Sequence, residues 1–399
     1  MRSSTGRRMS SWVGVWLGVG LAVGCGQTSD VTDAREELDS LLRTQVRVPL
    51  SAGEYHSLAL RRDGTLWAAG YNTSGQLGDG TTNSSNSPVR VQGLSRVAAV
   101  SAGDYHSLAV RTDGSLWAWG ANFTGQLGDG TTTARSQPAQ VPGLSGVVLA
   151  VADYYHSLAV RTDGTLWAWG HNASGQLGDG TTTARSAPVQ VTGLSGVVAV
   201  AAGESFSLAV RSNGALSAWG YNGYGLLGDG STPYRSTPAQ VPGLSGVVDV
   251  AAGTHHALAL RYDGTVWTWG YNYYGQLGDG TTSSRFTPKP VPGLSGVVAV
   301  AAGNHHSLAL RDDGTVWTWG NNSYGQLGED TPSYRTTPAQ VPGLSGILGV
   351  AGGGSHSLAV HYDGTAWTWG ANFFGQLGDG TETSHSGPVQ VPGLGAEGL

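Results

Sequence analysis

From Arg47 onwards the sequence consists of a 50-residue repeat. The segment Val-Pro-Gly-Leu-Ser-Gly-Val-Val-Ala-Val-Ala-Ala-Gly, followed by His-Ser-Leu-Ala-Leu, returns in closely similar form in successive copies, without insertions between them. A fixed period of this length is typical of solenoids, propellers and other repeat arrays. Positions that stay constant over the copies are expected to serve the architecture. A specific function is therefore expected at the positions that vary.

One repeat contains the pattern of four short strands. In the copy at residues 297–346, we expect strands at 297–300, 306–311, 315–319 and 338–341, with an Asp-Gly hairpin turn after the second. Four antiparallel strands repeated radially describe a propeller blade. The predicted fold is all-β, a seven-bladed β-propeller of four-stranded antiparallel blades. The blades are expected at 47–96, 97–146, 147–196, 197–246, 247–296, 297–346 and 347–396, followed by a tail at 397–399.

The connections between these strands fall into two sets, because alternate turns of an up-and-down sheet lie on the same side. In the copy at 297–346, the turn at 303–305 and the long loop at 320–337 should open on one face. The hairpin at 313–314 and the turn at 342–346 should open on the other. Seven complete units predict a closed ring, in which residues 47–50 pair beside residues 389–391.

The first 46 residues predict an export signal and a tether. Arg2, Arg7 and Arg8 precede an apolar stretch at 12–23, which is too short to span a bilayer as a stable helix. The segment Leu21-Ala-Val-Gly-Cys25 resembles a bacterial lipobox, and this resemblance implies diacylation of Cys25 after removal of a signal peptide at 1–24. Residues 25–46 would then form a tether with a short amphipathic helix. We expect an exported protein, at the outer membrane or at the cell surface or periplasm; a plain cleaved signal is the alternative.

The charge balance argues against nucleic acid as a partner. Only 12% of the residues are charged, Lys289 is the single lysine, and the net charge is −6. Nucleic-acid binding depends on clustered cations that neutralise phosphates, and no such cluster is present in the sequence. We therefore expect contact with the membrane through the lipid anchor only, and a monomeric protein.

The constant polar positions predict a scaffold rather than a metal or catalytic site. His56, His106, His156, His256, His306 and His356 share one position, which Phe206 occupies in the fourth copy. No second ligand stands at a zinc-like spacing, so these histidines are expected to form hydrogen bonds between blades. Each repeated Asp-Gly turn supplies one carboxylate, which is too few for calcium. No nucleophile or phosphate-binding motif is found, and the sequence predicts a non-enzymatic protein without metal or other cofactor.

The variable positions on the predicted loop-rich face are rich in aromatic rings. Such side chains, on loops held by a rigid scaffold, are typical of protein-binding surfaces. We expect partner contacts from Tyr55, Tyr71, Asp104, Tyr105, Phe123, Tyr154, Tyr155, His171, Glu204, Tyr221, His255, Tyr271, Tyr273, His305 and Phe373. Arginines further along the same loops, such as Arg135 and Arg185, are expected to belong to this surface. Four neighbouring rings fit a role in the core and in contact equally well: Tyr224, Tyr274, Tyr324 and Phe374.

Two segments carry a family resemblance. Residues 100–110, Val-Ser-Ala-Gly-Asp-Tyr-His-Ser-Leu-Ala-Val, and residues 119–128, Trp-Gly-Ala-Asn-Phe-Thr-Gly-Gln-Leu-Gly, resemble the two signatures of the regulator of chromosome condensation repeat family. The resemblance extends over residues 47–394 and implies a seven-bladed propeller. It does not imply one function, because the family includes a guanine-nucleotide exchange factor for a nuclear small GTPase, a plant ultraviolet-B photoreceptor and secreted bacterial inhibitors of β-lactamase.

Two of these functions fit the sequence poorly. The repeats carry no insertion that could act as the wedge of an exchange factor, and the tryptophans lie in Trp-Ala-Trp or Trp-Thr-Trp strands without the arginines of the photoreceptor. The sequence favours a membrane-tethered interaction scaffold that binds a protein or glycan through its loop-rich face. The alternative is a secreted or tethered enzyme inhibitor that resembles the propeller-type β-lactamase inhibitors.

Overall fold

The computed structural model describes residues 49–231, 233–330 and 333–394. They belong to one compact unit, residues 46–399. The predicted signal peptide, Cys25, the tether helix and the tail lie outside the described residues. Within the described part of the chain, no helix is long and apolar enough to cross a membrane.

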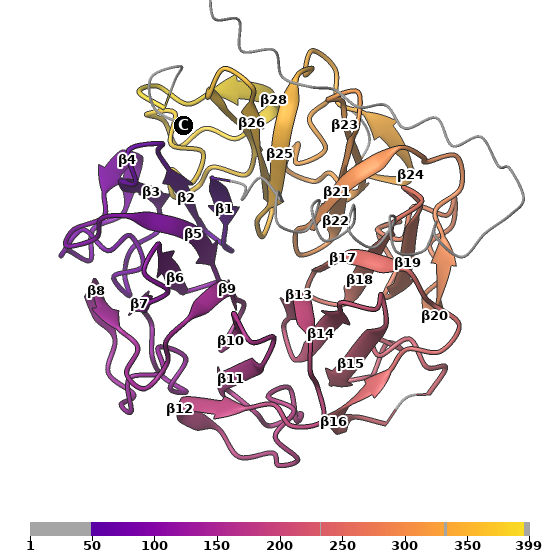
Figure 1. Cartoon of the computed structure of the whole chain (residues 1–399). Coiled ribbons are helices and arrows are strands. Elements are labelled where there is room, and N and C mark those ends of the chain that lie inside the picture. The colour runs from indigo at the N-terminus through magenta and orange to yellow at the C-terminus, as the bar shows by residue number, and fades with distance from the viewer. Residues whose placement is uncertain (1–48, 232, 331–332, 395–399) are drawn as a thin grey trace, which may run out of the picture. The chain divides into compact units, whose positions relative to one another are not determined.

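In residues 49–394, as far as the structure describes them, twenty-eight strands form seven four-stranded sheets, and each sheet is built from consecutive strands of the chain. All pairings within the sheets are antiparallel, for example β5–β6, β6–β7 and β7–β8. Figure 1 shows the sheets arranged as blades around a central opening. The predicted seven-bladed propeller is therefore confirmed. We number the blades 1 to 7 from β1–β4 to β25–β28.

The first strand of each blade lines the central opening, and the second packs against it. The innermost strands are β1 (Leu50–Ala52), β5 (Val97–Ala102), β9 (Val147–Ala152), β13 (Val197–Gly203), β17 (Val247–Ala252), β21 (Val297–Ala302) and β25 (Ile347–Gly352). The second strands are β2 (His56–Leu60), β6 (His106–Arg111), β10 (His156–Arg161), β14 (Phe206–Arg211), β18 (His256–Arg261), β22 (His306–Arg311) and β26 (His356–His361).

The third strand carries the tryptophans, and the fourth forms the outer edge. The third strands are β3 (Leu66–Gly70), β7 (Leu116–Gly120), β11 (Leu166–Gly170), β15 (Leu216–Gly220), β19 (Val266–Gly270), β23 (Val316–Asn321) and β27 (Ala366–Gly370). The outer strands are β4 (Ser85–Arg90), β8 (Arg135–Gln140), β12 (Arg185–Gln190), β16 (Arg235–Gln240), β20 (Arg285–Pro290), β24 (Tyr334–Gln340) and β28 (His385–Gln390).

The end of the third strand passes close to the first turn of its own blade. Gly120 has a φ of 103°, a conformation that glycine adopts without a steric penalty. A Cβ atom at this position would lie 2.5 Å from the carbonyl oxygen of Tyr105. Glycine therefore allows the long loop to start directly beside the first turn. This close approach brings the variable residues of both loops together.

Hydrophobic packing between neighbouring blades forms the core. The indoles of Trp119, Trp169 and their equivalents in blades 4 to 7 are fully buried. The Nε1 of Trp119 donates to the carbonyl oxygen of Gln76 in the preceding blade at 2.8 Å. Each of these tryptophans therefore fills one interface and also satisfies a backbone carbonyl across it. Blade 1 has Ala69 instead, and a small cavity of about 20 Å³ lies at its interface with blade 7.

The ring closes through side-chain packing and single backbone hydrogen bonds, such as the one from the Gly380 N–H to the carbonyl oxygen of Asn86 at 2.8 Å, rather than through strand pairing. We expected residues 47–50 to pair with the end of the last repeat, but β1 pairs with β2, and β28 pairs with β27. Instead, Leu50 shares a hydrophobic cluster with Leu358, Val391 and Leu394. The expected strand pairing is wrong because each repeat supplies all four strands of its own blade.

The histidine position forms a ring of hydrogen bonds between blades, as predicted. The Nε2 of His56 lies 2.8 Å from the Oγ of Ser107 in the next blade, and His356 bonds Ser57 at 2.9 Å across the closure. The serine hydroxyl donates to a backbone carbonyl, for example from Ser107 to Gln76 at 2.9 Å, so the imidazole Nε2–H is the donor to the serine. We call this set the His–Ser ring: His56/Ser107, His106/Ser157, His156/Ser207, His256/Ser307, His306/Ser357 and His356/Ser57.

The His–Ser ring is interrupted at one place, between blades 4 and 5, where both partners are replaced. Phe206 replaces the histidine in blade 4, and Ala257 replaces its serine partner in blade 5. Both are fully buried in one hydrophobic cluster, together with Leu226. Removing both partners of a buried hydrogen bond leaves no unsatisfied group, whereas removing only one is costly. The paired replacement supports a structural role for the other six histidines.

Candidate functional site

The first turn and the long loop lie on the same face in all seven blades. The N–H of Tyr71 donates to the carbonyl oxygen of Tyr55 at 2.9 Å, and the equivalent bond in blade 4 joins Tyr221 to Ser205 at 2.8 Å. At the other end of the strands, the hairpin turns contact the turns between blades. For example, the N–H of Thr112 donates to the carbonyl oxygen of Arg96 at 2.9 Å. The predicted division of the loops is confirmed. We call the face with the first turns and long loops the loop face, and the other the hairpin face.

A continuous row of aromatic rings crosses the loop face from blade 7 to blade 3. Phe374 lies 4.8 Å from Tyr71, measured between ring centroids, and Tyr154 lies 4.2 Å from Tyr155. All of these side chains are partly exposed. The first aromatic arc consists of Phe374, Tyr71, Tyr55, Tyr105, Tyr154, Tyr155 and His171.

A second row covers blades 4 to 6. Tyr224 lies 5.0 Å from His255, and Tyr274 lies 5.2 Å from His305, again between ring centroids. Tyr273 is the most open ring of this row, with 64% of its surface exposed. The second aromatic arc consists of Tyr221, Tyr224, His255, Tyr271, Tyr273, Tyr274 and His305.

Four rings were expected either to pack in the core or to contact a partner, and in the structure they are packed and partly exposed at once: Tyr224, Tyr274, Tyr324 and Phe374. Tyr224 contacts rings of its own blade and of the next, and it remains 38% exposed. Phe374 packs between Tyr55 and Tyr71 of the neighbouring blade. These rings therefore connect adjacent blades at the surface while leaving part of their area open.

The remaining predicted contact residues differ in their surroundings. Phe123 is 68% exposed and lies outside both arcs, while Phe373, also exposed, packs against Tyr324 at 5.2 Å. Glu204 pairs with His255 at 3.2 Å. Asp104 departs from the expected surface position: only 8% of it is exposed, because it points down to the central channel.

The arginines of the long loops are held in ion pairs and remain partly exposed, so their place at the contact surface stays a prediction. The Nε of Arg135 lies 2.6 Å from the Oδ2 of Asp129, and the equivalent Arg185–Asp179 pair is 2.8 Å long. The aspartate in each pair is the residue of the repeated Asp-Gly turn. These arginines therefore fasten the start of the outer strand to the long loop of their own blade.

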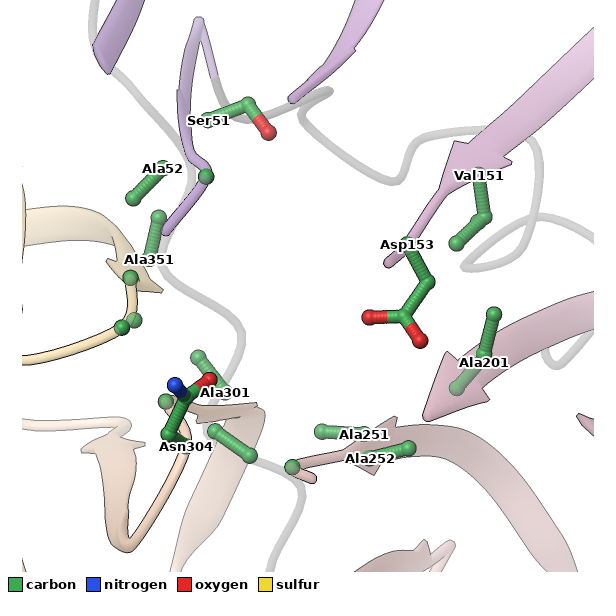
Figure 2. Close-up of a pocket in the computed structure, with 18 of the residues that line it drawn as sticks. Ser51, Ala52, Val151, Asp153, Ala201, Ala251, Ala252, Ala301, Asn304 and Ala351 are labelled. Carbon is green, nitrogen blue, oxygen red and sulfur yellow. The ribbon is translucent and has the colours of Figure 1, made fainter. Parts of the chain in front are cut away.

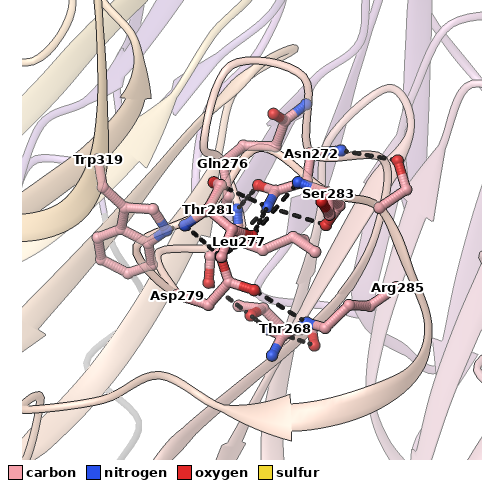
Figure 3. Close-up of polar contacts among 10 residues, drawn as sticks. Thr268, Asn272, Gln276, Leu277, Asp279, Thr281, Ser283, Arg285 and Trp319 are labelled. Atoms are coloured by element: carbon pink, nitrogen blue, oxygen red, sulfur yellow. Dashed lines mark hydrogen bonds and ion pairs between the residues drawn. The ribbon is translucent and has the colours of Figure 1, made fainter.

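Hydrogen bonds inside the long loop hold it in one shape. In blade 5 the Nδ2 of Asn272 donates to the carbonyl oxygens of Thr281 and Ser283, each at 3.1 Å, and its Oδ1 accepts from the N–H of Leu277 at 2.9 Å (Figure 3). The Oδ1 of Asp279 accepts from the N–H of Thr281 at 2.9 Å. The long loops, which carry part of both aromatic arcs, are thus internally bonded, and this limits the entropy lost on binding.

A cavity of about 350 Å³ lies on the propeller axis and opens between the first turns. Alanine side chains such as Ala251, Ala301 and Ala351 line most of its wall (Figure 2). Polar side chains stand at one end, where Asp153 and Asn304 extend into the opening. The channel is therefore narrow and apolar along its length and polar at its loop-face end.

Three carboxylates, Glu54, Asp104 and Asp153, line this end, and Glu204 of the next blade lies near enough for its charge to act on them. We call these four residues the acidic mouth. Burial raises the pKa of Asp153 to about 8. Burial, reinforced by the charge of Asp153, raises the pKa of Asp104 well above its usual range. The pKa values of Glu54 and Glu204 are raised as well, in both cases chiefly by burial. The ionised forms of these groups are destabilised in the free protein.

The sequence carried a signal for Asp153 that the comparison of loop positions missed. Six repeats have glycine at this position, as in Gly103 and Gly203, and only blade 3 has aspartate. The variable pairs of the first turns, such as residues 54–55 and 104–105, begin one residue later in the repeat. A search for single departures from constant positions would have found it.

No metal site is formed by the described residues. Among them, no group of three or more His, Cys, Asp or Glu side chains is arranged to hold a metal ion. In the His–Ser ring, burial lowers the pKa of His106 to about 3, and His306 behaves in the same way. These imidazoles are neutral and occupied by their serine partners.

Comparison with known families agrees with the repeat pattern. Residues 152–398 match the model of the RCC1-like domain, and residues 63–110 and 113–160 match the regulator of chromosome condensation (RCC1) repeat. A second model of this repeat matches residues 97–126. The chain belongs to the RCC1-like family. Such propellers are mostly regulatory or interaction modules.

Solved structures show the same fold. The chain is similar to a crystal structure of Kap60 bound to yeast RCC1 (Prp20), with 23% identity, a TM-score of 0.76, and coverage of 95% of this chain and 91% of the other. Prp20p from Saccharomyces cerevisiae gives 24% identity and a TM-score of 0.75, with 89% of each chain covered. Human WBSCR16 gives 26% identity and a TM-score of 0.70, with coverage of 78% of this chain and 85% of that one.

Proposed function

We propose that this RCC1-like propeller is a non-enzymatic interaction module that binds a protein partner through its loop face. The observation that carries the proposal is the pair of aromatic arcs, which place partly exposed tyrosines on internally bonded loops. Tyrosine offers a large contact area and a hydroxyl at low entropic cost, and it is enriched among the residues that dominate binding energy.

We further propose that Cys25 is acylated and tethers the module to a membrane. This part rests on the lipobox resemblance of residues 21–25. Mass spectrometry of the mature protein tests it directly. A diacylated Cys25 at the new N-terminus is the expected result, and a chain that retains residues 1–24 or carries an unmodified Cys25 contradicts it.

The binding proposal is tested by affinity capture with the full chain. We expect a partner that is recovered by the wild type and lost by the double variant Tyr105→Ala/Tyr155→Ala, which removes two neighbouring rings of the first arc. A matched control is Tyr262→Ala/Tyr362→Ala, because these tyrosines are 70% and 64% exposed on the hairpin face. The control should retain the partner.

The identity of the captured partner separates the forms of this function. A soluble hydrolase that loses activity in the complex indicates that the propeller is an inhibitor covering an active site. A surface component indicates a tethered adhesion module, and a glycan-dependent capture shifts the partner class to carbohydrate. Capture that depends equally on both pairs of tyrosines, or on neither, overturns the assignment to the loop face.

A further inference from the structure

Asp104 and Asp153 are two largely buried carboxyl groups of the acidic mouth that form no ion pair among the described residues. Asp104 is 8% exposed, lines the axial cavity and accepts no hydrogen bond among the described residues. The Asp153 carboxylate accepts one hydrogen bond from the backbone N–H of Tyr154, but its Oδ2 is fully buried without a partner among the described residues, and Figure 2 shows this carboxylate directed into the opening. A buried carboxylate without a partner costs several kilocalories per mole in general, so such groups are normally paired.

The charges at the mouth are distributed unevenly. Glu54, Asp104, Asp153 and Glu204 come from blades 1 to 4, and burial together with the charge of Glu204 raises the pKa values of the other three. The equivalent positions in blades 5 to 7 are neutral: Thr254, Asn304 and Gly354. Asn304 donates to Glu54 across the opening. The mouth therefore has one strongly acidic side, and no cation of the described chain neutralises Asp104 or Asp153.

The first aromatic arc lies over this acidic side. Tyr55 and Tyr105 follow Glu54 and Asp104 directly in the chain, and Tyr154 follows Asp153. Their ring centroids are 6.0 to 6.4 Å apart. Aromatic faces beside carboxylates suit an organic cation, because the rings attract the charge and cover its apolar stem.

We infer that the acidic mouth receives the guanidinium or ammonium group of a basic side chain presented by the protein partner. This inference rests on the proposed function and adds the chemistry of the partner to it. A side chain from a docked protein enters along the axis, pairs with Asp104 and Asp153, and leaves its backbone against the first aromatic arc. A divalent metal ion fits less well, because it needs several converging oxygens, whereas a guanidinium distributes its donors over separated carboxylates.

The probe is a capped pentapeptide, acetyl-Gly-Gly-Arg-Gly-Gly-amide, measured against the full chain by saturation-transfer NMR. Its control has citrulline in place of arginine, which keeps the shape and removes the charge. We expect saturable binding of the arginine peptide and binding of the citrulline peptide that is weaker by about tenfold or more. Equal binding of the two peptides, or no binding of either, overturns the inference.

Variants locate the binding in the acidic mouth. The double variant Asp104→Asn/Asp153→Asn should bind the arginine peptide about tenfold or more weakly than the wild type does. The more exposed Glu204→Gln should give a smaller loss in the same direction and does not disturb a buried position. Asp313→Asn, which removes one charge on the hairpin face, should change nothing. An arginine peptide that binds the double variant as well as the wild type overturns the assignment, as does calcium chloride that saturates the mouth and displaces the peptide.

The outcome is separable from that of the proposed function. A partner captured through Tyr105 and Tyr155, together with no preference for arginine over citrulline, overturns only the cation site. Arginine-dependent peptide binding without any partner lost in the Tyr105→Ala/Tyr155→Ala variant overturns the proposed interface and leaves the cation site in place.

Discussion

The His–Ser ring and the acidic mouth both bury ionisable groups near the axis, but the two regions differ in how these groups are hydrogen-bonded and in the direction in which their pKa values shift. His106 is fully buried, bonds Ser157 at 2.8 Å and has a pKa lowered to about 3. Asp104 is almost as buried, but it has no hydrogen bond among the described residues and its pKa is raised. The comparison separates groups that a fold has paired for its own stability from groups whose partner must come from elsewhere.

The same contrast appears in how the two regions vary between repeats. The ring changes only by the paired replacement of Phe206 and Ala257, which leaves neither a histidine Nε2 nor a serine hydroxyl without its partner. The mouth changes at almost every blade and includes Asp153 at a position that is glycine in the six other repeats. Positions that are the same in all repeats therefore belong to the scaffold, whereas positions that differ in one repeat, such as Asp153, belong to the candidate site.

The pH dependence of stability should show the largest effect, with opposite signs for the two regions. The six ring histidines have folded pKa values far below the unfolded value of about 6.5, so unfolding takes up protons and stability falls as the pH falls from 7 towards 3. Each contributes about 1.4 kcal/mol per pH unit below pH 6. Urea unfolding at pH 7, 6 and 5 measures this slope.

The carboxylates of the mouth act against that slope, because their raised pKa values favour folding at low pH. The histidine effect is therefore cleanest in the Asp104→Asn/Asp153→Asn background. In that background His106→Phe/Ser157→Ala should reduce the proton uptake on unfolding by about one. Stability that stays constant between pH 7 and pH 5 contradicts the assignment of neutral buried histidines.

A double-mutant cycle at His306 and Ser357 sharpens the role of pairing. Ser357→Ala alone should cost about 1–3 kcal/mol, because the buried Nε2 of His306 loses its 2.9 Å partner. Adding His306→Phe reproduces the Phe206/Ala257 arrangement and should recover most of this loss. Denaturant unfolding of the four proteins gives the coupling energy. If the double variant is no more stable than Ser357→Ala, hydrogen-bond pairing does not explain the replacement in blade 4.

Asp153→Asn should stabilise the free protein, in contrast to the ring substitutions. The folded pKa of about 8 lies above the unfolded value of 3.8, so the penalty is full above pH 8 and disappears below about pH 4. We expect a gain of about 1–2 kcal/mol at pH 9 and a smaller gain at pH 5. The control Asp313→Asn should show no such gain, because hydrogen bonds from Thr315 lower the pKa of that exposed aspartate. A loss of stability at pH 9 would show that the hydrogen bond from the Tyr154 N–H outweighs the cost of burying the Asp153 charge.

The smallest effect is expected at the one interface without a buried tryptophan. Ala69→Trp should fill the space beside Gly378 and place an indole near the carbonyl oxygen of Gln376, which Ser57 already bonds at 2.7 Å. A gain of about 1 kcal/mol is typical of cavity filling, and thermal unfolding detects it. A lower midpoint indicates that the cavity is too small for the ring without displacement of its neighbours.

Most of the architecture could be predicted from the sequence, because equivalent residues make the same packing contacts in every repeat. Blade number, strand order, the two sets of loops and the structural role of the histidines all follow from comparing positions 50 residues apart. The surroundings of individual loop residues did not follow, since they depend on which side chains converge across blades. The ion pair of Arg135 with Asp129 of its own loop, for example, was not predicted. Asp104 and Tyr105 are neighbours in the chain, yet one faces the axis and the other lies in the aromatic arc.

Ring closure without strand exchange has a further consequence for the connectivity of the chain. Each of the seven sheets comes from one repeat, and His356 meets Ser57 in the same way as the other five pairs meet. A circular permutant that joins Leu394 to Pro49 through a short linker and opens the chain between blades 3 and 4 keeps all seven blades whole. It would transfer the chain break from the interface with Ala69 to one that contains Trp219. Comparing the two chains would show how far the missing indole, rather than the break itself, makes one interface of the propeller weaker than the rest.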